Sequence, residues 1–150
     1  MDFLLFKGVG CVSVLDISAA ALQRARVRLG EHAARVNWIE ADVTGDWTVA
    51  PVDIWHDRAV FHFLTNPDDR ARYVAHLRTA LKSGGSAIIA TFAPDGPQMC
   101  SGLKCVRYSP DALHRELGDE FRLDESIREG HETPSGRVQQ FGYQRFTRVQ

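Results

Sequence analysis

The feature that most constrains the fold of this chain is the alternation of short apolar segments with segments of helical periodicity. Residues 11–16 (CVSVLD) are rich in β-branched and apolar side chains, which indicates a buried strand. Over residues 18–29, apolar residues recur at helical spacing opposite several arginines, and Gly30 is well placed to end this helix. Further strands are predicted at 36–41 and 52–56. This alternation is typical of a parallel sheet covered by helices on both faces.

The second half of the chain continues the alternation and ends in a pair of strands. Residues 66–69 (NPDD) open a helix with a capping side chain, proline at the first position and carboxylates near the positive end. Residues 86–92 (SAIIATF) predict the most buried strand, and an irregular stretch, 93–108, follows it. Ser109 and Pro110 begin a short helix. The last segments predict an antiparallel hairpin, with strands at 121–127 and 138–149 and a polar turn at 129–136.

Composition limits the partners that this chain can have. Its 150 residues amount to about one domain, predicted to span 1–150, and 44% hydrophobic with 25% charged residues is ordinary for a globular protein. Eighteen basic residues against 19 acidic ones give a net charge of −1, so we expect neither nucleic acid nor an anionic membrane as partner. The apolar run at 3–6 is too short to span a membrane and lacks a basic leader, which predicts a cytoplasmic protein.

The three cysteines, Cys11, Cys100 and Cys105, are odd in number, and none stands at the spacing of a metal finger. We interpret them as free thiols in a reducing compartment and predict no metal site. The alternative is that Cys100 and Cys105 form a disulfide or half of a metal site.

Several strings of the sequence together resemble a known family. VSVLDIS, WIEADV, VDIWHDRAVFHFL and LKSGGSAIIATFAPDG, followed by the terminal strand pair, resemble the class I S-adenosylmethionine-dependent methyltransferase domain in its usual order, over about residues 1–148. WHDRAVFHFLT and TFAPDGPQMCSGL are similar to an uncharacterised bacterial subgroup. The resemblance implies an α/β, Rossmann-like sheet with a C-terminal antiparallel hairpin, S-adenosyl-L-methionine as cofactor, and an unidentified acceptor that is a small molecule or a protein.

Two acidic residues at strand ends are candidates for binding that cofactor. Asp16 ends a strand, where its carboxylate can accept hydrogen bonds from both ribose hydroxyls. Asp42 follows the next strand 26 positions later, a span that puts two neighbouring strand ends beside one ligand. The resemblance implies that Asp42 accepts from the adenine amino group, that the Val43 amide faces a ring nitrogen, and that Ile17 packs on the adenine. The alternative for Asp16 is that it caps the following helix.

The third predicted strand leads to residues that would form the floor of the transfer site. The resemblance places His56, Asp57 and Arg58 there, whereas Asp57 and Arg58 alone could be a surface ion pair. His56 is the candidate base, since imidazole titrates near neutral pH. His62 is a candidate substrate contact, but its apolar surroundings equally fit a histidine of the core.

The irregular stretch 93–108 follows the strand that borders the acceptor pocket in this family. Five residues in it would be available to bind the acceptor: Asp95, Cys100, Ser101, Arg107 and Tyr108. A thiol nucleophile at Cys100 is conceivable, but direct displacement of a methyl group does not need one.

The sequence departs from the family at its start. The family begins with a strand that runs into a glycine-rich turn, and here residues 1–7 resemble the helix that follows this turn. Residues 8–10 (GVG) are too few for a parallel crossover, so we interpret them as a turn. The chain is therefore predicted to be N-terminally truncated, with the missing strand lying between those that end at Asp16 and His56. Two unpaired sheet edges would then favour self-association and weaken cofactor binding.

Two other classes of function compete with a methyltransferase. One is a non-catalytic remnant or interaction module of the same fold. The other is an NAD(P)-dependent oxidoreductase, which also uses an acidic strand end. Tyr73 is followed by His76 where a short-chain dehydrogenase would carry lysine, which disfavours the second class.

Overall fold

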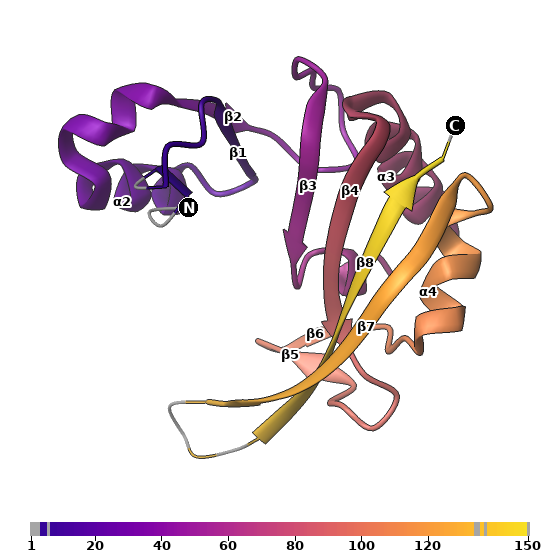
Figure 1. Cartoon of the computed structure of the whole chain (residues 1–150). Coiled ribbons are helices and arrows are strands. Elements are labelled where there is room, and N and C mark those ends of the chain that lie inside the picture. Colours follow the sequence, from indigo (N-terminus) through magenta and orange to yellow (C-terminus); the bar gives the residue numbers. More distant parts are fainter. Residues whose placement is uncertain (1–3, 6, 134–135, 137, 150) are drawn as a thin grey trace. The chain divides into compact units, whose positions relative to one another are not determined.

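The computed structural model of the chain describes residues 4–5, 7–133, 136 and 138–149 (Figure 1). The chain divides into two compact units, residues 1–49 and residues 50–150. Among the described residues, the first unit contains a parallel pair of strands joined by helix α2, and the second contains a mixed sheet of four strands together with helices α3 and α4.

In the first unit, β1 (Val12–Asp16) pairs in parallel with β2 (Val36–Glu40). Helix α2 (Ala19–Leu29) and the 3₁₀ helix η1 (Gly30–Arg35) connect the two strands. The core of this unit is formed by apolar side chains from the N-terminal segment, both strands and the end of the helix: Leu5, Val12, Leu29 and Val36. The predicted strand–helix–strand order is confirmed here.

The helix ends follow the local signals in the sequence. The Ser18 hydroxyl accepts a hydrogen bond from the Ala21 amide at 3.2 Å and so caps the start of α2. The Gly30 amide donates to the carbonyls of Arg26 and Val27 at the end of the helix. Since Gly30 has φ of 55°, a residue without a side chain fits this position best.

Before β1, the chain ends a helical turn. Leu4 and Leu5 are helical; the Gly8 amide donates to the Leu5 carbonyl at 3.2 Å, and the Val9 amide donates to the Leu4 carbonyl at 3.1 Å. With φ of 79° at Gly8, this is the Schellman pattern that ends α-helices. The predicted turn is therefore confirmed as a helix ending, and Leu4 and Leu5 fit the predicted helix, whose other residues at 1–3 and 6 lie outside the described ones.

The second unit is built on a sheet with strand order β3-β4-β8-β7. Strands β3 (Val52–Arg58) and β4 (Leu81–Phe92) are parallel, while β8 (Val138–Arg148) is antiparallel to both β4 and β7 (Phe121–Glu132). This arrangement confirms the predicted terminal hairpin.

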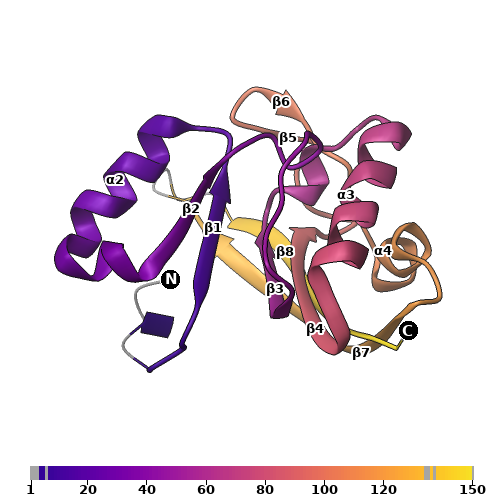
Figure 2. The same ribbon diagram turned by 90° about the horizontal axis from the view of Figure 1, so that it is seen from above.

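Two helices, α3 (Pro67–Ala80) and α4 (Pro110–Leu117), lie on the same side of this sheet in two perpendicular views (Figures 1 and 2). Asn66 and Ser109 cap them through their side chains, and each helix has proline in its first turn, as the sequence predicts. Between the helices and the sheet lies a core of fully buried side chains that includes Phe61, Tyr73, Leu77, Ile89, Leu113 and Phe146.

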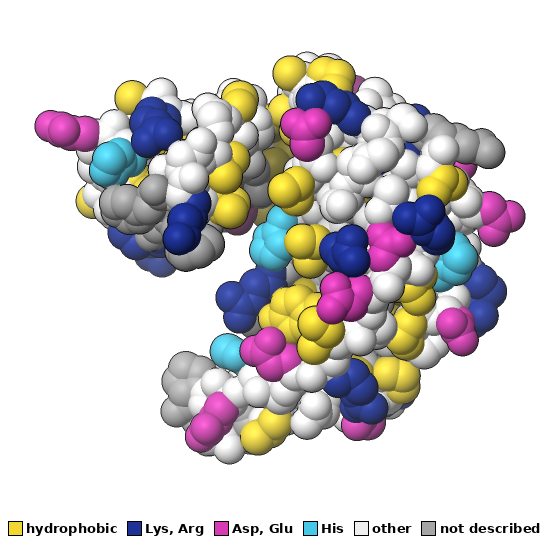
Figure 3. Space-filling view, viewed as in Figure 1, with side chains coloured by type: hydrophobic (Ala, Val, Ile, Leu, Met, Phe, Trp, Pro, Cys, Tyr) yellow, Lys and Arg dark blue, Asp and Glu magenta, His cyan; other side chains and the backbone are white. Residues whose placement is uncertain are grey.

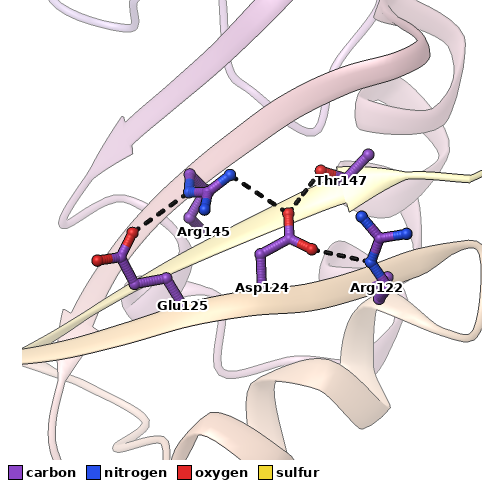
Figure 4. A network of polar contacts seen from close by, with 5 residues as sticks. All are labelled: Arg122, Asp124, Glu125, Arg145 and Thr147. Carbon is purple, nitrogen blue, oxygen red and sulfur yellow. Dashed lines mark hydrogen bonds and ion pairs between the residues drawn. The ribbon is translucent and has the colours of Figure 1, made fainter.

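A network of hydrogen bonds and ion pairs stabilises the register of the terminal hairpin (Figure 4). Asp124 is the extra residue at a register shift between β7 and β8, and its carboxylate accepts hydrogen bonds from Thr147 at 2.5 Å and Arg122 at 2.8 Å. Arg145 on β8 contacts both Asp124 and Glu125 at 3.4 Å. The Thr147 hydroxyl, followed by Arg122, lowers the pKa of Asp124 from its ordinary value.

Three segments differ from the sequence-based prediction. Strand β4 runs through the predicted turn at 82–85, and β7 extends to Glu132, beyond the predicted end at 127. The stretch predicted as irregular contains a small hairpin, β5 (Met99–Cys100) with β6 (Leu103–Lys104), whose turn residues Ser101 and Gly102 both have positive φ. Two-residue strands are too short to give a periodic signal, so the pattern could not reveal them.

Strands β1 and β3 belong to separate sheets, and within the described part of the chain each of them pairs along one edge only.

Candidate functional site

The ends of β1 and β2 bring Asp16 and Asp42 to one edge of the first sheet. Asp16 lies opposite Glu40 in the parallel register, and the Ala41 amide donates to the Asp16 carbonyl at 3.2 Å. Asp42 follows one residue later. Asp16 and Asp42 therefore lie at the same edge of the sheet, as their spacing predicts, because parallel strands present their carboxyl ends on the same edge.

Asp16 keeps part of its carboxylate available. Its Oδ1 accepts a hydrogen bond from the Ser18 amide at 2.8 Å, whereas Oδ2 accepts none from the described residues. The helix cap itself is Ser18, so capping is not the role of Asp16. Ile17, between them, is 70% exposed. The site thus offers a half-buried carboxylate oxygen beside an exposed apolar side chain.

The loop after β2 is ordered by Asp42. Its Oδ1 accepts from the Thr44 amide at 2.8 Å and from the Thr44 hydroxyl at 2.7 Å, and its carbonyl accepts from the Gly45 amide at 2.9 Å. The Val43 carbonyl accepts from the Trp47 indole at 3.1 Å, while the Val43 amide donates to no described acceptor. An unpaired amide at this edge is a ready donor to a ligand.

The turn after β3 is held by a buried carboxylate, Asp57. Asp57 is only 5% exposed, and it accepts hydrogen bonds from the Val60 amide at 2.8 Å, the Phe61 amide at 3.0 Å and the Tyr73 hydroxyl at 2.8 Å. The Trp55 indole in turn donates to the Tyr73 oxygen at 2.9 Å. Asp57 therefore joins β3, the turn and α3.

Burial changes the pKa values of Asp57 and Tyr73. Desolvation raises the pKa of Asp57, against the lowering effect of the Val60 and Tyr73 hydrogen bonds. Desolvation, with the Asp57 charge beside it, raises the pKa of Tyr73 well above its ordinary value. Asp57 is therefore buried in the fold and does not line the floor of an open site. Among the described residues, it forms no ion pair with Arg58. The ion-pair alternative is wrong because Asp57 and Arg58 are successive residues of a strand, whose side chains point to opposite faces.

His56 and Arg58 point to the other face of β3, and both are exposed. The His56 imidazole makes no hydrogen bond with the described residues, so it is available to a ligand on that face. Of the three residues predicted for the floor of the transfer site, these two are accessible and Asp57 supports the strand that carries them.

His62 lies in the core with no exposed surface. Its Nδ1 accepts a hydrogen bond from the Phe92 amide at 3.3 Å, and its ring stacks on that of Phe92 with centroids 4.5 Å apart. Desolvation lowers the pKa of His62 to about 4, so the ring is neutral near pH 7. The predicted substrate contact does not fit this position, and the alternative of a core histidine describes it.

The five candidates in the stretch 93–108 are dispersed. Asp95 is exposed and forms an ion pair with Arg128, whose hydrogen bond lowers the pKa of Asp95. Cys100 is half-buried, Ser101 lies in the turn of the small hairpin, and Arg107 is exposed. Tyr108 is 3% exposed, and burial raises its pKa to about 12. Tyr108 therefore packs inside, which does not fit a direct contact with an acceptor.

The cysteines and the other potential metal ligands remain separate. All three thiols are free, so the disulfide alternative for Cys100 and Cys105 is wrong. Among the described residues, no group of three or more His, Cys, Asp or Glu side chains could hold a metal ion. No helix in the described part of the chain is long and apolar enough to cross a membrane. On the face seen in Figure 3, basic and acidic side chains are interspersed.

Sequence reasoning missed the roles of Trp55 and Tyr73. The helix predicted to open at 66–69 contains Tyr73, and the strand predicted at 52–56 contains Trp55, but neither pattern shows where the polar end of a side chain points. A tyrosine on the buried face of a helix needs a hydrogen-bond partner, and this was the available signal.

Comparison with known proteins defines the class. The model of the methyltransferase domain family matches residues 3–85, more than half of the chain. The chain therefore belongs to the methyltransferase domain family, and the predicted class I fold is confirmed. No curated protein matches the chain.

Solved structures agree with this assignment. A SAM-dependent methyltransferase from Methanosarcina mazei is 14% identical with a TM-score of 0.75, over 98% of this chain and 86% of that one. The N-methyltransferase NodS from Bradyrhizobium japonicum WM9, in complex with S-adenosyl-L-homocysteine, is 14% identical with a TM-score of 0.72, over 92% and 66%. The 1,6-didemethyltoxoflavin-N1-methyltransferase from Burkholderia thailandensis is 20% identical with a TM-score of 0.68, over 91% and 60%. At these identities the likeness concerns the fold.

Proposed function

We propose that this chain binds S-adenosylmethionine at the carboxyl edge of β1 and β2 and is a methyltransferase for an acceptor that is still to be identified. The observation that carries this proposal is the register of the two strands, which brings the Asp16 carboxylate and the Val43 amide to one edge. Both groups keep hydrogen-bonding capacity that the described residues do not use. These groups suit the nucleoside half of the cofactor.

Asp16 would hold the ribose. A carboxylate oxygen has two lone-pair positions, so the unused Oδ2 together with the second position of Oδ1 can accept from two neighbouring hydroxyls. Ile17, which is 70% exposed, would cover one face of the adenine. Burying such a side chain under a flat ring is favourable because it removes apolar surface from water.

Asp42 and Val43 would recognise the adenine edge. The Thr44 contacts fix the Asp42 carboxylate and with it the loop, so the Val43 amide is held in place before the ligand arrives. Such preorganisation reduces the ordering cost of binding. The amino group of adenine would donate to the Asp42 carboxylate, and a ring nitrogen of adenine would accept from the Val43 amide.

The bound cofactor supplies an electrophilic methyl group, and the chain aligns the acceptor and excludes water. His56 would take a proton from an acceptor whose nucleophilic atom carries one; its exposure and the absence of a hydrogen bond with the described residues support this role. Arg58 lies on the same face of β3. Asp57 acts from within by holding the turn that ends the strand.

Calorimetric titration with S-adenosylhomocysteine tests the cofactor site. We expect Asp16→Ala to weaken binding by roughly 1.5–3 kcal/mol, because it removes charge-assisted hydrogen bonds. Asp46→Ala is the control, since Asp46 is another carboxylate of the first unit, is exposed, and makes no hydrogen bond or ion pair with the described residues. Equal affinities of wild type and Asp16→Ala would contradict the assignment.

A thermal-shift experiment separates the methyltransferase from the non-catalytic alternative. A ligand that binds only the folded state stabilises it by RT ln(1 + [L]/Kd), so a binder melts at a higher temperature as S-adenosylmethionine is added. A melting temperature that stays constant would favour the remnant or interaction module.

We also propose that the unpaired edges of β1 and β3 favour self-association. Each strand pairs on one side only within the described residues, and an open edge can accept another strand. Size-exclusion chromatography with light scattering should show a mass that rises with protein concentration, and a monomer at every concentration would refute this. The three free thiols support a reducing compartment such as the cytoplasm.

A further inference from the structure

The stretch after β4 borders a groove that none of the contacts described above uses. It has a volume of about 590 Å³, within the range of small-molecule sites. Pro94, Met99 and Val106 supply apolar walls, and Met99 is 48% exposed. Gln98 adds an amide that can both donate and accept.

The charge of the groove is one-sided. Lys104 and Arg107 are its charged lining residues, and no acidic side chain joins them. Neither forms an ion pair with a described residue; among the described residues, the Arg107 guanidinium hydrogen-bonds to the Gly96 carbonyl alone, at a long 3.5 Å. Asp95, near the start of the same stretch, is paired with Arg128 instead. Two cations therefore face the groove without a counter-charge from the described residues.

The backbone holds this groove at the carboxyl edge of the parallel strands. The Val106 amide donates to the His62 carbonyl at 2.8 Å, and the Tyr108 amide donates to the Phe92 carbonyl at 2.9 Å. Inside the stretch, the Cys105 amide donates to the Gln98 carbonyl at 2.9 Å. Because His62 follows β3 and Phe92 ends β4, the groove is tied to both strand ends, which is where open α/β sheets bind ligands.

We propose that this groove binds the methyl acceptor, and that the acceptor is a small organic carboxylate with an apolar body. The carboxylate lies between Lys104 and Arg107, and the body lies against Met99, Pro94 and Val106. A guanidinium matches a carboxylate with two parallel hydrogen bonds, and an ammonium adds a point charge. The assignment of the ligand as acceptor rests on the proposed methyltransferase function, whereas its charge and shape rest on the groove alone.

The chain carries a reporter inside the groove. It has two methionines, Met1 and Met99, so labelling the methionine methyl groups with ¹³C gives two NMR signals, and Met99→Leu assigns them. The probes are 4-hydroxybenzoate and its neutral counterpart 4-hydroxybenzamide, titrated into the full chain. We expect 4-hydroxybenzoate to move the Met99 signal saturably and to bind at least about tenfold more tightly than the amide.

Two variants test whether Lys104 and Arg107 bind the carboxylate of 4-hydroxybenzoate. Lys104→Gln and Arg107→Gln should each weaken binding of 4-hydroxybenzoate by about tenfold. Arg115→Gln is the matched control, because Arg115 is an exposed arginine of the same unit that makes no contact with described residues and does not line the groove. No saturable movement of the Met99 signal, equal binding of the amide, or an equal loss in Arg115→Gln would each overturn the proposal.

A third arm separates this proposal from the cofactor assignment. S-adenosylhomocysteine also carries a carboxylate, so it is titrated with the same readout. If it leaves the Met99 signal in place and binds alongside 4-hydroxybenzoate, the acceptor assignment is supported. If it displaces 4-hydroxybenzoate, the groove belongs to the cofactor and the acceptor assignment fails. If it does not bind at all, the proposed function fails while the carboxylate preference of the groove is still measured.

Discussion

Replacing His62 should change how stability depends on pH. The ring is fully buried, stacked on Phe92, and neutral in the folded state because desolvation lowers its pKa to about 4. In the unfolded chain the same imidazole titrates near its ordinary value of 6.5. Between these two values the unfolded state binds a proton that the folded state does not.

The direction and the size of this pH dependence of stability follow from the linkage between proton binding and unfolding. Because the pKa in the folded state is lower, the stabilising contribution is fully present above pH 6.5 and is lost as the pH falls from 6.5 through 4. The difference of about 2.5 pKa units, at 1.36 kcal/mol for each, corresponds to a loss of about 3 kcal/mol of unfolding free energy. This is a large part of the stability of an ordinary domain.

Urea denaturation at a series of pH values between 4 and 7 measures the effect. His62→Gln keeps an acceptor for the Phe92 amide but does not titrate, so its unfolding free energy should depend less steeply on pH than that of the wild type, whatever its absolute stability. Equal slopes for wild type and His62→Gln, or a His62 pKa near 6.5 by NMR, would refute the reasoning.

Two further substitutions test the packing around the proposed sites. Tyr73→Phe should lower the unfolding free energy by about 1–3 kcal/mol in urea denaturation, because Asp57 loses one of its three donors and the Trp55 indole loses its acceptor; an unchanged midpoint would argue against this network. Gly96→Ala should cost about 1–3 kcal/mol, because its Cβ would lie 2.8 Å from a backbone carbonyl of β8, whereas Gly10→Ala, which meets nothing within 4 Å, should be close to neutral. Equal effects of the two glycine substitutions would contradict the predicted clash.

The elements that could be predicted from the sequence are those with a local signal. Ser18, Asn66 and Ser109 begin the three helices because their side chains accept hydrogen bonds from amides in the first helical turn, an interaction that needs only neighbouring residues. The position of Asp16 and Asp42 at the same edge of the sheet was predictable for a similar reason, since two parallel strands joined by a helix must end on the same side.

The residues that could not be placed from the sequence depend on contacts between distant segments. Asp57 is buried because its donors come from the turn after it and from Tyr73, 16 residues later. His62 is in the core because it packs against Phe92, which lies 30 residues further along at the end of β4. The family resemblance placed Asp57 at the floor of the transfer site, and His62 was a candidate substrate contact, but packing buries both side chains.

The two proposed binding sites lie in different units of the chain, and this makes their coupling measurable. Asp16 belongs to the first unit, and Lys104 and Arg107 belong to the second. Methyl transfer requires cofactor and acceptor to be bound together, so saturating 4-hydroxybenzoate should not abolish binding of S-adenosylhomocysteine. Lys104→Gln, in turn, should change the affinity for S-adenosylhomocysteine by less than about threefold, as expected for residues without a shared partner. Any coupling that does appear must be reciprocal, with each ligand changing the affinity of the other by the same factor, and calorimetry in both orders checks this. Mutually exclusive binding would mean that the two ligands compete for one site, and the assignment of groove and strand edge to separate substrates would be wrong.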